Sequence, residues 1–100
     1  MLMLDYVPLE TYRMDGENLV EVGQITHYFA KISVAVVDLT SRIEVGDTIV
    51  IKGPTTDSTQ LVESMQIEHE SVKEAKAGQS VGLKVDQRVK EKDIVYKKLS

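Results

Sequence analysis

Closely spaced turn signals are the feature that most constrains how this chain can fold. Val45-Gly46-Asp47, Gly53-Pro54 and Ala77-Gly78 each let the backbone reverse, because glycine adopts conformations closed to other residues and proline removes a backbone hydrogen-bond donor. Between these turns, residues 47–52 and 81–85 alternate in the manner of β-strands. The chain is therefore expected to reverse direction repeatedly between short strands.

Further strands are predicted on both sides of these turns. Their expected positions are residues 19–29 and 32–39 with a bend at Ala30-Lys31, a longer strand over residues 60–69 with a bulge between Val62 and Met65, and a last strand over residues 94–97. Residues 55–58 are expected to form a polar loop tip. Six or seven short strands without a convincing helix predict an all-β fold, a small antiparallel Greek-key β-barrel that is closed or nearly closed.

The size of the chain suits one domain. One hundred residues, 42% of them hydrophobic, leave no room for a second independent core. Residues 1–18 carry a proline and turn-type residues without an apolar period, so they are expected to be a partly ordered N-terminal extension. The barrel is then expected over residues 19–100.

Charge is divided unevenly along the chain. The net charge is -4, which argues against a general nucleic-acid binder, yet residues 71–100 hold eight basic and four acidic side chains. This basic run is either a solvated edge that discourages strand aggregation or a phosphate-facing strip. Lys84, Arg88 and Lys90 are the candidate contacts for the second alternative.

The absence of cysteine excludes a disulfide framework and a thiol nucleophile, and it is compatible with the cytoplasmic location that we expect. No apolar stretch approaches the roughly 18 residues needed to span a bilayer, so no membrane partner is expected. A soluble protein is predicted.

Few side chains carry the chemistry of a site. His27 and His69 are the two histidines, and nothing in their spacing predicts a metal site, so both are expected to be structural or to contact a partner. Tyr28 could anchor a partner or stack on a nucleotide base, and its exposure stays open. Phe29 is expected to pack in the core, next to an apolar run.

The turn after Gly53 offers a further candidate contact. Thr55, Thr56 and Asp57 could present amides and hydroxyls to a partner, although a tight turn needs the same residue types. A triad of Ser64, His69 and Asp47 lacks any signal of a positioned base or an oxyanion site. No catalytic residue, metal or cofactor is therefore predicted.

An ordered series of motifs resembles known barrels. Val45-Gly46-Asp47, residues 64–69, Ala77-Gly78, Val81-Gly82 and residues 93–96 resemble the second domain of elongation factors that deliver aminoacyl-tRNA, including stand-alone archaeal-type relatives. Residues 22–29 and 53–57 resemble the C-terminal barrel of collagenase-like peptidases, a relative of the same translation-protein barrels. The two resemblances cover about residues 20–99 and imply a barrel of the translation-protein type.

The resemblance implies a binding module without catalytic residues. The first hypothesis is a translation- or RNA-associated role, with tRNA or another RNA as the partner. The alternative is a protein-protein adaptor, a detached accessory domain of a peptidase-like or GTPase-like partner. No GTP binding is expected, since the chain has no GxxxxGK[ST] phosphate loop.

Overall fold

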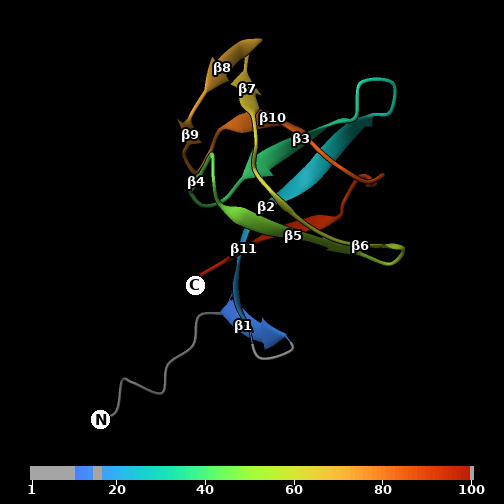
Figure 1. The fold of residues 1–100 in the computed structure, drawn as a ribbon, viewed down its shortest axis with the longest axis vertical. Coiled ribbons are helices and arrows are strands. Elements are labelled where there is room, and N and C mark those ends of the chain that lie inside the picture. The colour runs from blue at the N-terminus through green and yellow to red at the C-terminus, as the bar shows by residue number, and fades with distance from the viewer. Residues whose placement is uncertain (1–10, 15–16, 100) are drawn as a thin grey trace.

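The structure of this protein, a computed structural model, describes residues 11–14 and 17–99, and its regular elements are all β-strands (Figure 1). In chain order they are β1 (Thr11–Met14), β2 (Glu17–Phe29), β3 (Val34–Leu39), β4 (Ile43–Glu44), β5 (Thr48–Gly53), β6 (Thr56–Leu61), β7 (Met65–Ile67), β8 (Glu70–Val72), β9 (Glu74–Ala75), β10 (Ser80–Lys84) and β11 (Ile94–Lys98). These residues include no helix, and so none long and apolar enough to cross a membrane. The predicted all-β class is confirmed.

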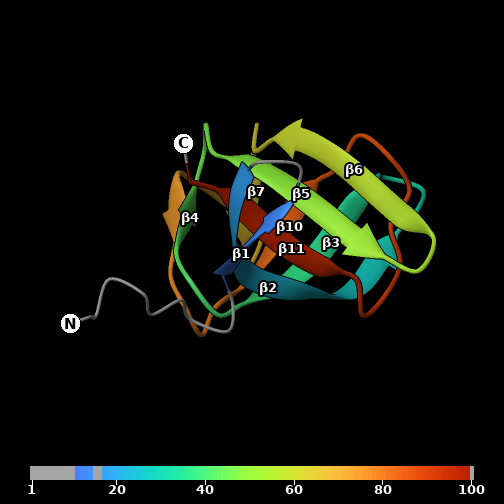
Figure 2. The same ribbon diagram turned by 90° about the horizontal axis from the view of Figure 1, so that it is seen from below.

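One curled antiparallel sheet forms most of the molecule. Its strands follow the order β6-β5-β11-β2-β3-β10-β7-β8, with β1 added beside β2, while β4 and β9 pair separately. Both ribbon views show the sheet curving so that β5 and β6 lie across from β3 and β10 (Figures 1 and 2). The path of paired strands stays open between β6 and β8, so of the two expected forms, closed or nearly closed, the barrel is not closed.

A side chain bridges part of the gap beside β6. Gln60 is 7% exposed, and its Nε2 donates to the Lys84 carbonyl while its Oε1 accepts from the Asp86 amide, each over 2.9 Å. The side-chain amide thus satisfies backbone groups that a neighbouring strand would otherwise pair. Gln60 therefore connects the edge strand β6 to the end of β10.

The core comes from the inward-facing positions of these strands. On β3, Ala35 and Val37 are fully buried, whereas Val34 and Val36 on the opposite face are half-buried. One cluster fills the inside of the curl, with side chains that include Val22, Ile25, Ala35, Val37, Ile49, Ile51, Met65, Val81, Leu83 and Val95. Val, Ile, Leu and Met supply most of this core.

A bulge in the long strand β2 changes which of its side chains face outward. The register with β3 shifts between Ile25 and His27, which places one extra residue on β2. Ile25 and Tyr28 then face the core, while His27 and Phe29 are exposed. The prediction that Phe29 packs in the core is therefore wrong, because the bulge turns its side chain to the outer face of the sheet.

The predicted turns lie where the sequence placed them. Gly46 has a φ of 102°, and the Glu44 amide beside it donates to Asp47 Oδ2 over 2.9 Å. Gly78 has a φ of 91° in the turn that precedes β10. The reversal at Gly53-Pro54 is also confirmed, but only Pro54 and Thr55 form the turn and β6 begins at Thr56, so the predicted polar tip over residues 55–58 is wrong.

The predicted strand over residues 60–69 is interrupted twice. β6 ends at Leu61, β7 covers only Met65–Ile67, and the chain then reverses at Glu68 and His69 into β8. Both turn residues have positive φ, 51° and 70°. Two positive values are typical of a type I′ hairpin turn, and the sequence did not reveal it because Asn and Gly, the usual residues, are missing.

Most of the predicted N-terminal extension, residues 1–10 and 15–16, lies outside the described residues. The described part of that segment contains β1, which pairs with the start of β2. Leu19, the first residue of the predicted barrel, is buried in a second, smaller cluster with Val50 and Tyr96. The boundary between an extension and the barrel stays a prediction.

Candidate functional site

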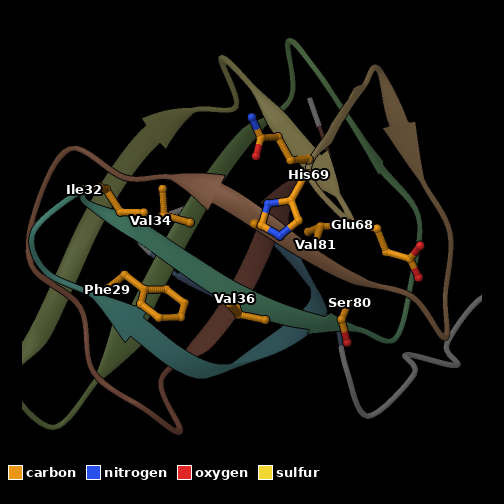
Figure 3. A pocket seen from close by; sticks show the side chains of 10 residues that line it. Phe29, Ile32, Val34, Val36, Glu68, His69, Ser80 and Val81 are labelled. Atoms are coloured by element: carbon orange, nitrogen blue, oxygen red, sulfur yellow. The ribbon is translucent and has the colours of Figure 1, made fainter.

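The outer face of β2, β3, β10 and β7 carries a hollow of about 400 Å³ (Figure 3). Strand register brings Val36, Gly82 and Gln66 into one row across β3, β10 and β7. Val34 and Val36 lie along β3 in this face, and both are half-buried. Because Gly82 has no side chain, the surface is depressed at the middle of this row. The neighbouring valines, Val34 and Val36, make the floor of the depression apolar.

Two hairpin turns form the walls of the hollow. The last residue of β2, Phe29, and Ile32 in the turn that follows form one wall, and they are 45% and 57% exposed. The turn between β7 and β8 contributes Glu68 and His69, and the imidazole of His69 projects toward the hollow across from Val36 (Figure 3). The hollow thus combines an apolar floor with a few polar groups at its rim, which is the usual composition of a binding site.

The polar groups are unequally distributed between the two ends. Figure 3 shows Phe29 and Ile32 at one end and Glu68 and Ser80 at the other. Ser80 Oγ donates to the Asp38 carboxylate, so a second carboxylate adjoins that end. One end is therefore apolar and the other acidic.

A lysine is tied to the apolar end. Lys84 Nζ donates to the Ile32 carbonyl over 3.0 Å, and the backbone amide of Val85 donates to the Ser33 carbonyl over 2.9 Å. These bonds hold the β2–β3 turn against the end of β10. The turn that carries Ile32 is consequently held by one backbone hydrogen bond and one side-chain hydrogen bond.

The end of β2, with His27, Tyr28 and Phe29, lies next to the hollow. His27 Nδ1 is 3.4 Å from the Glu91 carboxylate, and its ring lies 4.3 Å from that of Phe29 at 59°. Tyr28 faces inward and packs against the main core, so its side chain is only partly available to a partner. Among the predicted contacts, His69 lines the hollow, and Lys84 and His27 border it.

Other predicted contacts lie elsewhere. Thr55 and Lys90 line a second hollow of about 330 Å³, and Asp57 forms an ion pair of 2.9 Å with Lys52. Arg88 is exposed in the loop before β11 and lines neither hollow. Thr56 is 6% exposed, which contradicts its predicted role as a partner contact, because it faces inward on β6.

The three residues of the triad that the sequence analysis rejected, Ser64, His69 and Asp47, do not meet at the hollow. Asp47 Oδ2 accepts from the Glu44 amide and lies 3.9 Å from Lys97 Nζ, so it serves a turn. Ser64 is exposed but does not line the hollow that contains His69. Within residues 11–14 and 17–99, no three or more His, Cys, Asp or Glu side chains are arranged to hold a metal ion.

A separate ionic cluster stands beside the small sheet of β4 and β9. Arg42 donates hydrogen bonds to Glu74 and Glu44. The hydrogen bond from Arg42, and then its charge, lower the pKa of Glu74, while the same bond raises the pKa of Arg42. All three side chains are about half exposed, so this cluster fastens β4 to β9 and does not contribute to the hollow.

Sequence reasoning missed Phe29, Gln66, Glu68 and Gly82 as parts of a site. One signal was available, because residues 34–37 are apolar at four consecutive positions, which gives β3 apolar side chains on both faces. One face packs in the core, and the other forms the floor of the hollow. The remaining residues reach this face only through the register of four strands.

Comparisons with known proteins identify relatives of the whole barrel. The family model described as the peptidase family U32 C-terminal domain matches residues 17–95. An uncharacterized protease of Methanocaldococcus jannaschii is 42% identical over 78 residues, and a collagenase of Porphyromonas gingivalis is 36% identical over 78 residues. These matches cover 77% and 76% of this chain but only 19% and 22% of the relatives.

A solved structure shares the fold. The C-terminal domain of a protein described as a U32 peptidase, from Geobacillus thermoleovorans, superposes with a TM-score of 0.72 at 23% identity, covering 76% of this chain and 89% of that one. The expected resemblance to peptidase barrels is thereby confirmed. The expected likeness to elongation factors finds no support in these relatives.

Proposed function

Because this chain belongs to the peptidase family U32 C-terminal domain family, we propose that it is a non-catalytic accessory domain that binds a protein partner beside a peptidase-type catalytic unit. The chain spans about a fifth of the curated relatives that it matches, which are named as a protease and a collagenase. Activity in those relatives therefore has ample room outside the matched segment. This is the adaptor alternative inferred from the sequence.

The observation that carries the proposal is the apolar hollow between two hairpin turns. Phe29 and Ile32 are large apolar side chains that stay about half exposed at its rim. Exposed apolar groups gathered around a concave surface are typical of a protein-binding or ligand-binding site. Contact with a partner would remove them from water, which favours association.

The RNA hypothesis receives less support. The hollow is bordered by the carboxylates of Glu68 and Asp38, which repel phosphate groups. Of the three predicted basic contacts only Lys84 borders the hollow, while Lys90 lies beside Thr55 and Arg88 lines neither hollow. We therefore favour a protein partner.

The test uses the full chain and the M. jannaschii relative from which the 78 matched residues have been removed. Isothermal titration calorimetry is expected to show association between the two. Ile32→Ala should weaken it, because that side chain stands at the rim of the hollow. Leu61→Ala is the matched control, since Leu61 is 53% exposed, similar in size, and located on β6 away from the hollow.

Two results would contradict the proposal. One is the absence of association, or association that Ile32→Ala and Leu61→Ala affect equally. The other is binding of tRNA that weakens steeply with salt and is lost on charge reversal at Lys84, Arg88 and Lys90, which would favour the RNA hypothesis. Peptide hydrolysis by the purified chain alone would contradict its non-catalytic role.

A further inference from the structure

From the hollow and its charge distribution we infer that its occupant is a protein segment that combines an apolar side chain with a neighbouring basic one; this rests on the proposed function. The apolar side chain lies on the floor over Gly82, and the basic side chain reaches the carboxylates of Glu68 and Asp38. Three independent features of the hollow support this assignment.

The first feature is a glycine that the fold does not require. A Cβ at Gly23 would lie 2.6 Å from the Asp38 carbonyl, and one at Gly53 would lie 1.9 Å from Asp93 Oδ1, so a side chain at either position would clash with its neighbour. Gly82, in contrast, has no positive φ, and its Cβ would meet nothing nearer than 3.4 Å.

Glycine inside a strand weakens the strand, and it often marks the close approach of a ligand or another backbone. Gly82 occupies the middle of β10, between Val36 and Gln66. Any larger side chain here would point from the floor into the hollow and fill it. Room for an incoming apolar group is therefore the physical reason for glycine at this position.

The second feature is the turn between β7 and β8. Glu68 and His69 both have positive φ, a conformation that is unfavourable for residues with a side chain. Asn or Gly would relieve this strain, but neither would supply a carboxylate or an imidazole at the rim of the hollow. Glu68, His69 and Gly82 all line the same hollow. Residues that depart from local conformational preferences are expected to gather at functional sites.

The third feature is the charge at the acidic end. Within the described part of the chain, neither Glu68 nor Asp38 has a basic partner within ion-pair distance, although Asp38 accepts a hydrogen bond from Ser80. At the opposite end, Lys84 is occupied by the Ile32 carbonyl. The hollow is thus complementary to a segment that is apolar at one end and cationic at the other.

The experiment measures binding of blocked eight-residue peptides to the full chain. Each peptide has a glycine-serine background with one leucine and, one to four residues away, either one arginine or one glutamate. Amide chemical shifts of the ¹⁵N-labelled protein report the site, and fluorescence anisotropy reports the affinity. The leucine-arginine peptide should shift the Gly82 and Gln66 amides and bind about fivefold more tightly than the leucine-glutamate peptide.

Variants separate the floor from the charge. Gly82→Leu should weaken the leucine-arginine peptide by roughly tenfold or more, because the new side chain fills the space that the peptide leucine takes. Glu68→Lys should abolish the preference for the leucine-arginine peptide, because the new lysine offsets the charge of the remaining Asp38 carboxylate. Glu63→Lys makes the same change of charge at an exposed site that does not line the hollow, and it should leave the preference as it is.

The inference is overturned if the two peptides bind equally well, or if Glu63→Lys and Glu68→Lys act alike. It is also overturned if no peptide shifts the Gly82 amide, or if tRNA competes for the hollow. One result would refute the basic partner and leave the accessory role intact. In it, binding of the truncated relative depends on Ile32 but not on Glu68 or Asp38. Loss of that binding altogether would refute the proposed function.

Discussion

Replacement of Gln60 by alanine should remove the link that joins β6 to the end of β10. The side chain makes two hydrogen bonds of 2.9 Å, to the Lys84 carbonyl and from the Asp86 amide. Each neutral bond contributes about 1 kcal/mol net, and loss of a buried methylene adds about 0.8 kcal/mol. Gln60→Ala is therefore expected to lower the free energy of unfolding by about 3 kcal/mol.

Two measurements check this expectation. Thermal unfolding should show a Tm lower by roughly 12 to 24 °C, since about 1 kcal/mol corresponds to roughly 4 to 8 °C in a domain of this size. Hydrogen exchange should accelerate at the Asp86 amide, which loses its acceptor. The Val85 amide is an internal reference, because it donates to the Ser33 carbonyl and not to Gln60.

A matched control separates this role from a general effect of removing glutamine. Gln79 is exposed, and its side-chain oxygen accepts one bond, from the Lys76 amide over 2.7 Å. Gln79→Ala should lower the free energy of unfolding by less than about 1 kcal/mol. Equal effects of the two replacements, together with unchanged exchange at Asp86, would refute the reasoning.

Three further perturbations test other parts of the fold. Gly53→Ala should lower the free energy of unfolding by roughly 2 kcal/mol or more in urea, because its Cβ would lie 1.9 Å from Asp93 Oδ1, and a second change, Asp93→Ala, should recover part of that loss. Arg42→Gln should destabilise the protein near pH 7, with a deficit that shrinks as the pH falls below 4.5. The Arg42 guanidinium lowers the pKa of Glu74 from its ordinary 4.5, so this stabilisation is fully present above 4.5 and is lost as the pH falls through the lowered pKa. A deficit independent of pH would contradict that assignment. Ser58→Ala should leave the free energy of unfolding unchanged or raise it by up to about 1 kcal/mol, since the buried Ser58 hydroxyl has no hydrogen-bond partner in the described part of the chain. A clearly lower free energy of unfolding in urea would contradict this expectation.

Predictions from local pattern succeeded where one segment carries its own signal. The reversals at Gly46 and Gly78 require glycine, and the alternation over residues 81–85 fits one buried and one exposed face. Strand β11 also lies where its apolar run predicted it. Such features depend on neighbours in sequence, so a single sequence reveals them.

Predictions failed where the decisive contact comes from a distant segment. The inner face of β6 consists of Thr56, Ser58 and Gln60, so a buried strand looked like a polar loop. Its polar side chains are tolerated because Gln60 bonds to backbone groups that follow β10. Phe29 was misplaced because a bulge shifts the alternation of β2 relative to β3.

The sequence by itself determined an all-β chain, most of its reversals and the apolar character of both faces of β3, because these follow from side-chain period and backbone preference within a few residues. Only the tertiary structure decided that Gly82, Val36 and Gln66 share one row and that two separate turns enclose it. The hollow exists because strand register across the sheet brings together residues that are far apart in the sequence, such as Val36 and Gly82, and register is a property of the assembled sheet.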